Sequence, residues 1–191
     1  MLVMVGIPGA GKSTFVEQLI ASCGAVCWSR FCQDELGNRD KVLQAARKAL
    51  RGDAHNPAGV SVVIDRTDFD AAQRAHWVQL AREEGAQALA LTLLPEGSGP
   101  EGYRLCLQRA QQRPDHPSDA NQPGGAPWDR ICKTFHGKLS RSPVDAAAEG
   151  FAWSHVVDGS VLGGEDAMGR ELDRIRSVLK DHSAPDAIAA A

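Results

Sequence analysis

Short apolar runs alternate with longer amphipathic segments along this chain of 191 residues. The apolar runs have the length and β-branched content of buried strands, and we predict strands at residues 2–5, 26–31, 60–65, 86–94 and 155–158. The amphipathic segments repeat with the helical period, and we predict helices at residues 14–20, 38–51, 70–84, 103–113, 128–139 and 164–180. Strands that alternate with helices form right-handed βαβ units with parallel strands. The pattern therefore predicts an α/β protein with a mostly parallel five-stranded sheet and helices on both faces.

A glycine-rich segment directly follows the first predicted strand. Residues 6–13 read GIPGAGKS and match the phosphate-binding Walker A pattern G-x-x-x-x-G-K-[ST] in full. In such loops the backbone N–H groups converge on phosphate oxygens, the lysine reaches the β and γ phosphates, and the serine hydroxyl ligates Mg²⁺. The segment predicts a P-loop NTPase fold that binds a nucleoside triphosphate and Mg²⁺. The expected nucleotide contacts are Gly6, Pro8, Gly9, Ala10, Gly11, Lys12, Ser13 and Thr14, with Ser13 on the metal.

Two aspartates follow predicted strands at the sheet edge that carries this loop. Asp34 lies in the predicted loop after the second strand, and Asp65 ends the most apolar strand. Because ligands of parallel sheets bind at the carboxyl ends of the strands, both should face the phosphates. Asp34 is the candidate proton acceptor, although a lone loop aspartate is more often a turn residue. A buried Asp65 needs a metal-bound water, a lysine or a hydroxyl as partner, so we expect it beside Ser13 and Mg²⁺ or at the acceptor site.

Two arginines lie one helical turn apart at the edge of a segment rich in proline and glycine. Arg109 and Arg113 share the outer face of a predicted helix, and residues 114–127 follow it. This arrangement predicts a short lid at about residues 101–127 that places guanidinium groups on the β and γ phosphates. The alternative is a solvated arginine pair on an exposed helix.

Composition narrows the class of protein without selecting a substrate. The formal net charge of −3 argues against a surface that coats nucleic acid throughout. The five cysteines lack C-x-x-C spacing and predict reduced thiols of a cytoplasmic or nuclear protein. No run of about 18 apolar residues occurs, so we expect no membrane span, and we expect a monomer. We expect one domain at residues 1–181 and a flexible tail at 182–191.

One stretch near the lid has the opposite charge to the whole chain. Four cations and no acidic residue lie between positions 130 and 141, and they form a basic strip of Arg130, Lys133, Lys138 and Arg141. Such a strip is either a solvated helix face or a surface that faces an anion.

Three segments occur in an order and spacing that are more specific than the P-loop alone: GIPGAGKSTF at 6–15, QDELG at 33–37 and VVIDRTD at 62–68. With AAQR at 71–74 and WV at 77–78, they resemble the kinase domain of polynucleotide 5′-hydroxyl kinases. The chain is most similar to the P-loop domain of plant and fungal proteins fused to aprataxin-like modules. The resemblance covers about residues 1–160.

The resemblance implies roles for particular residues. It implies that Asp34 takes the proton of a nucleic acid 5′-hydroxyl and that Arg109 or Arg113 is the lid arginine on the triphosphate. Animal polynucleotide kinases have asparagine where Arg66 and Asp68 stand here, and this difference leaves the acceptor open. The candidate acceptor contacts are Asp34, Asp65, Arg66 and Arg39, with Arg30 and the basic strip as further candidates.

We therefore expect a phosphotransferase with an alcohol group as acceptor. The leading hypothesis is an ATP- and Mg²⁺-dependent polynucleotide kinase that acts on DNA or RNA 5′-hydroxyls in nucleic-acid end repair. Its catalytic residues would be Lys12, Asp34, Arg109 and Arg113. The alternatives are a small-metabolite P-loop kinase, which the acidic net charge favours, and a non-catalytic nucleotide-binding module.

Overall fold

A single parallel sheet organises the chain. The computed structural model describes residues 1–23, 28–53, 59–95, 100–112 and 127–182. The strands are β1 (Leu2–Val5), β2 (Trp28–Cys32), β3 (Ser61–Asp65), β4 (Leu89–Leu94) and β5 (Trp153–Asp158). They lie in the order β2-β3-β1-β4-β5, and every neighbouring pair is parallel. The predicted α/β fold with a five-stranded parallel sheet is confirmed.

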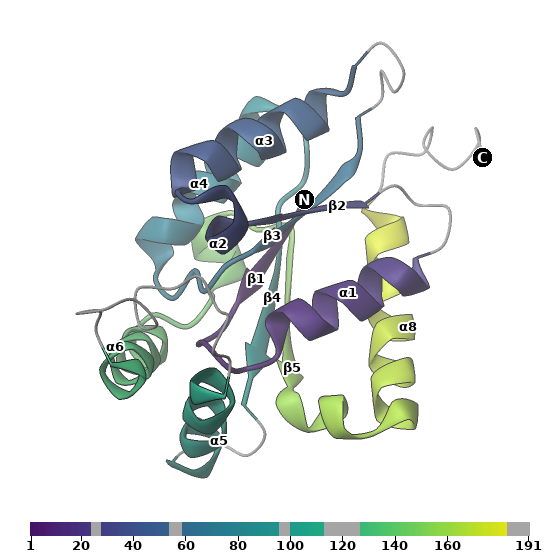
Figure 1. Ribbon diagram of the computed structural model, residues 1–191. Helices are drawn as coiled ribbons and strands as arrows, with labels where there is room; N and C mark the ends of the chain where they lie inside the picture. Colours follow the sequence, from purple (N-terminus) through teal and green to yellow (C-terminus); the bar gives the residue numbers. More distant parts are fainter. Residues whose placement is uncertain (24–27, 54–58, 96–99, 113–126, 183–191) are drawn as a thin grey trace.

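Helices cover both faces of the sheet (Figure 1). One face carries α1 (Lys12–Ser22) and α8 (Glu165–Asp181), and the other carries α3 (Arg39–Arg51) and α4 (Ala71–Glu83). Two further helices, α5 (Pro100–Gln111) and α6 (Trp128–Arg141), pack on each other and on the end of β1. Three short elements complete the fold: α2 (Gln33–Leu36), α7 (Ala146–Glu149) and the 3₁₀ helix η2 (Gly159–Gly163).

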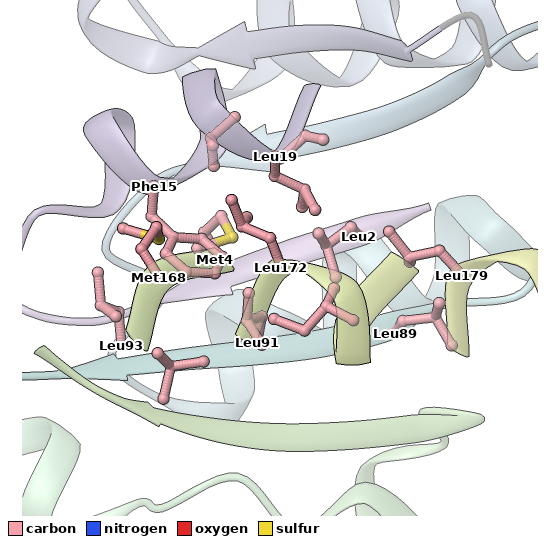
Figure 2. Close-up of a cluster of buried hydrophobic side chains, with 14 residues drawn as sticks. Leu2, Met4, Phe15, Leu19, Leu89, Leu91, Leu93, Met168, Leu172 and Leu179 are labelled. Atoms are coloured by element: carbon pink, nitrogen blue, oxygen red, sulfur yellow. The ribbon is translucent and has the colours of Figure 1, made fainter. Parts of the chain in front are cut away.

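The strands are apolar on both sides because each side faces a layer of helices. Leu2 and Met4 of β1 pack beneath α1 and α8, whereas Val3 packs beneath α3 and α4. Figure 2 shows the first of these clusters, in which Phe15 of α1 and Met168 of α8 lie close to Met4 of β1. Burying each such side chain contributes about 1.5–3 kcal/mol. The core thus fixes β1 in the middle of the sheet and sets where the P-loop begins.

Several element boundaries differ from the predictions. β4 begins at Leu89 rather than at residue 86, because Gly85 and Ala86 end α4 instead. Gly85 has a φ of 67°, and the Ala86 N–H donates to the Ala81 carbonyl at 2.8 Å, which is the Schellman pattern of a helix end. Asp34 lies on the single turn α2 rather than in a loop. The sequence patterns missed α7 and η2.

Some predictions fall outside the described residues. These are the start of the predicted second strand at 26–27, most of the predicted lid at 113–126, and the tail from 183 onward. Among the described helices, none is both long enough and apolar enough to cross a membrane.

Candidate active site

The P-loop turn needs glycine at two positions for reasons of both conformation and space. Gly9 has a φ of 80°, and a Cβ atom built on it would lie 2.0 Å from the carbonyl oxygen of Cys106 in α5. Gly11 has a φ of 91°, and its Cβ would lie 2.2 Å from Leu162 of η2. Residues with a side chain rarely adopt this left-handed backbone conformation. The loop is therefore held between α5 and η2 in a shape that only glycine permits.

The P-loop places backbone N–H donors and a lysine together at the N-terminus of α1. Gly11 is the N-cap of α1 and has no side chain to bond the first helical N–H groups, and no acidic residue lies in the first turn. Lys12 is only 8% exposed, and its Nζ donates to the carbonyls of Gly6 and Ile7 at 3.0 Å each. A helix N-terminus with a buried ammonium group beside it suits an anion. The residues present therefore fit the phosphates of a nucleotide.

The β3 edge lies directly beside the P-loop. β3 pairs with β1, and the Gly6 N–H donates to the Thr67 carbonyl at 3.0 Å, so the turn after β3 is bonded to the start of the loop. On its other side, Asp65 is in register with Cys32, the last residue of β2. Asp34 follows in the first turn of α2, where it is exposed. The structure thus brings the P-loop, Asp65 and the Asp34 turn to one sheet edge.

The partner of Asp65 is an arginine, not the metal-bound water, lysine or hydroxyl that we expected. Arg30 of β2 donates from Nε to Asp65 Oδ2 at 2.8 Å, and its Nη1 donates to Glu35 Oε1 at 2.6 Å. Burial alone would lower the pKa of Arg30, but the charge of Asp65 and the hydrogen bonds to Glu35 and Asp65 reverse this effect and raise the pKa. Arg30 therefore bonds two carboxylates of this chain. Sequence patterns gave no signal for the pair, because its members are 35 residues apart.

Arg66 and Asp68, the two residues after β3 that differ from animal polynucleotide kinases, form an ion pair with each other. Asp68 is fully buried, with a φ of 40°, and accepts a hydrogen bond from Arg66 Nη1 at 3.2 Å. The Arg66 guanidinium also lies 5.4 Å from the ring centre of Trp77. Burial raises the pKa of Asp68 to about 6, and the charge of Arg66 opposes that rise. Arg66, expected as an acceptor contact, thus points toward Asp68 and Trp77, and its side chain is 12% exposed.

Of the remaining candidate arginines, Arg39 and Arg109 lie on different helices. Arg39 is exposed at the start of α3 and contacts His76 of α4 at 2.9 Å. Arg109 is half-buried rather than on the outer face of α5, because the neighbouring residues Cys106 and Ala110 pack inward. Its Nη1 is buried and has no hydrogen-bond partner among the described residues. Arg113 lies outside the described part of the chain.

All four cations of the basic strip, Arg130, Lys133, Lys138 and Arg141, are exposed on α6. Lys138 lies over the ring of Phe69, with Nζ 4.7 Å from the ring centre, and Phe69 stacks on Phe135 of α6 at 4.5 Å. The exposed surface of α6 therefore carries all four cations, and one of them, Lys138, also contacts an aromatic ring.

The described cysteines are thiols without disulfide partners: Cys23, Cys32, Cys106 and Cys132. Burial raises the pKa of both Cys106 and Cys132 to about 11, so these two remain protonated near neutral pH. Across the described ranges, no group of three or more histidine, cysteine, aspartate or glutamate residues could hold a metal ion.

Comparisons with known proteins extend this description. The model of a family described as an AAA domain (AAA_33) matches residues 1–137. Transcription factor bHLH140 of Arabidopsis thaliana is 29% identical over 157 residues, which are 80% of this chain and 15% of that protein. A bifunctional polynucleotide phosphatase/kinase of Schizosaccharomyces pombe is 36% identical over 83 residues, which are 44% of this chain and 18% of that protein. The chain thus spans under a fifth of the length of these relatives.

Solved structures share the fold across nearly the whole chain. A fungal RNA kinase has a TM-score of 0.66 at 16% identity, with 98% of this chain and 92% of that chain covered. A gluconokinase from Sinorhizobium meliloti 1021 has a TM-score of 0.52 at 17% identity, with 96% and 97% covered. At such identities the likeness concerns the fold alone.

The parallel sheet and the P-loop behind β1 define a P-loop domain, and these solved kinases share its fold. The chain belongs to the AAA domain family whose model matches residues 1–137. The resemblance to polynucleotide kinases at the P-loop, the Asp34 segment and the Asp65 segment agrees with this assignment.

Proposed function

We propose that this chain is an ATP-dependent kinase domain that transfers the γ-phosphate to the 5′-hydroxyl of a nucleic acid. The observation that carries the proposal is the meeting of the P-loop, Asp65 and the Asp34 turn at one sheet edge. A polynucleotide acceptor is supported by the relative named a polynucleotide phosphatase/kinase and by the fold shared with an RNA kinase. We further propose a role in nucleic-acid end repair, and the free cysteines favour the cytoplasm or nucleus.

The donor side would be formed by the P-loop and α5. The N–H groups of the loop and Lys12 would hold the phosphates, and Ser13 would hold Mg²⁺, which neutralises phosphate charge when it is bound. Arg109 is our candidate for the arginine on the triphosphate, because its buried Nη1 lacks a partner among the described residues. Arg113 is the alternative for this role. Asp65 Oδ2 accepts a hydrogen bond from Arg30, so we place Asp65 on the acceptor side rather than on the metal.

The acceptor side would be centred on Asp34. Its exposed carboxylate at the sheet edge would accept the proton of the 5′-hydroxyl, and such help increases rates about 10²- to 10⁴-fold. Arg39 and the outer cations of α6 would contact phosphates further along the strand. Because these cations are exposed, their contacts would weaken as salt concentration rises.

A small-metabolite kinase is the second candidate function. The fold shared with a gluconokinase and the net charge of −3 favour it. A nucleotide-binding module without catalysis is the third, and it would bind nucleotide without transfer to any acceptor. These three candidates differ in where the γ-phosphate goes, so a transfer assay separates them.

The test offers γ-labelled ATP with 5′-hydroxyl DNA and RNA strands, nicked duplexes and a panel of small alcohols. We expect label on polynucleotides, and we expect Lys12→Met to abolish it. Label on a small alcohol and on no polynucleotide would refute the proposal in favour of the second candidate. Lys133→Glu should reduce the salt dependence of oligonucleotide binding by about one unit of slope, whereas an unchanged slope would remove α6 from the acceptor site.

A further inference from the structure

Arg30 connects the two carboxylate-bearing segments of the proposed acceptor side. Its Nε and Nη2 each lie 2.8 Å from Asp65 Oδ2 at the end of β3, and its Nη1 lies 2.6 Å from Glu35 in α2. We propose that Arg30 is a positioning residue that fixes the α2 turn, and with it Asp34, against the end of β3. This inference rests on the proposed function, because it assigns its effect to the transfer step.

The α2 turn depends on contacts from outside itself. It has four residues, its N-cap Cys32 makes no side-chain cap, and none of its residues is fully buried. A single helical turn is unstable alone, because nucleation fixes several residues for few hydrogen bonds. The turn is closed by the Gly37 N–H, which donates to the Gln33 carbonyl at 2.7 Å. The bond from Arg30 to Glu35 therefore anchors the residue that directly follows Asp34.

An arginine suits this role better than a lysine. The guanidinium is a planar fork that can donate to two carboxylates at once, whereas an ammonium group acts as a compact point charge. Arg30 meets Asp65, whose side chain is 2% exposed, and Glu35, whose side chain is 59% exposed. Removing the guanidinium would leave a buried carboxylate unpaired and damage the fold. Removing the charge of Glu35 would weaken this anchor, which adds to the packing of Leu36 on the core, and would leave the buried pair intact.

The experiment therefore compares Glu35→Gln and Arg30→Lys with Glu83→Gln, which removes the charge of an exposed Arg47 partner at the end of α4. It measures kcat, KM for ATP, nucleotide-binding stoichiometry, and hydrogen exchange of residues 33–37. For Glu35→Gln and Arg30→Lys we expect kcat to fall about 10- to 100-fold, because a misplaced catalytic group costs that order of rate. KM for ATP should stay within about twofold, because the donor side is untouched. Glu83→Gln should behave as wild type.

Hydrogen exchange separates this inference from the proposed function. If the wild type labels no polynucleotide, the proposed function fails, and exchange then decides the role of Arg30 alone. Faster exchange at residues 33–37 in Glu35→Gln, with unchanged exchange elsewhere, supports the anchor. Unchanged exchange and unchanged kcat would overturn it. A fall in kcat that matches an equal loss of nucleotide-binding sites would also overturn it, because that result reports a damaged fold.

Discussion

Asp68 is a buried acid whose protonation is coupled to folding. It sits in the turn after β3 with no exposed surface, and its carboxylate bonds Arg66. We predict that Asp68→Asn changes how stability depends on pH. Asparagine has the same shape and, like aspartate, tolerates the left-handed backbone that this position adopts with a φ of 40°. The substitution therefore removes the titration while it preserves the local geometry.

The magnitude follows from the pKa of Asp68, which burial raises from 3.8 to about 6. The folded state then binds the proton more tightly than the unfolded state does. The resulting stabilisation is fully present below about pH 4 and is lost as pH rises through about 6. The full contribution is about 3 kcal/mol, of which about 1 kcal/mol is lost between about pH 5 and about pH 8. Asp68→Asn should not show this loss.

The assay is urea unfolding at several pH values, with Asp40→Asn as the control for loss of an exposed negative charge on α3. Relative to wild type, the unfolding free energy of Asp68→Asn should increase by about 1 kcal/mol from about pH 5 to about pH 8. Loss of the bond to Arg66 shifts the unfolding free energy of Asp68→Asn by an offset. The test is therefore how the difference in unfolding free energy between the two proteins changes with pH. Parallel pH curves for wild type and Asp68→Asn would refute the reasoning.

Three further substitutions test how side chains pack at the P-loop, on α8 and around α4. Gly9→Ala should lower stability by about 2 kcal/mol or more and impair nucleotide binding, because its Cβ would lie 2.0 Å from a carbonyl oxygen of α5. Gly169→Ala on α8 is the control, because its Cβ would enter open space, and it should increase stability by up to about 1 kcal/mol. Thermal unfolding and nucleotide titration measure both glycine variants. Equal effects of the two substitutions would contradict the packing argument. Arg74→Met should cost about 3–5 kcal/mol in chemical unfolding, because fully buried Arg74 bonds both carboxylate oxygens of Glu149, at 2.6 and 2.7 Å. A loss below about 1 kcal/mol would show that Glu149 finds solvent instead.

Much of the fold could be predicted because its determinants are local. The continuous apolar runs of β1 and β3 follow from burial on both faces, and the P-loop follows from eight adjacent residues. The end of β3 also placed Asp65 at the correct sheet edge. Strand starts were less predictable, because the end of α4 at Gly85 and Ala86 competes with the first residues of the apolar run.

The contacts within the site could not be predicted, because they depend on tertiary register. Arg30 and Asp65 meet only because β2 pairs with β3 in a particular alignment, and Arg74 meets Glu149 across 75 residues. The orientation of Arg109 depends on how α5 packs against the P-loop. Residue type and order identified the candidates, whereas the partners of each candidate emerged only from the fold.

Transfer of phosphate to a nucleic acid 5′-end tests the central claim most directly. The measurement is the rate at which label from γ-labelled ATP appears on the 5′-end of a 5′-hydroxyl oligonucleotide, for wild type and for Asp34→Asn, with nucleotide binding measured in parallel. We predict 5′-end label with wild type and a rate lower by about 10²-fold or more in Asp34→Asn, with nucleotide binding intact. Absence of label on every polynucleotide, or an undiminished rate in Asp34→Asn, would contradict the account.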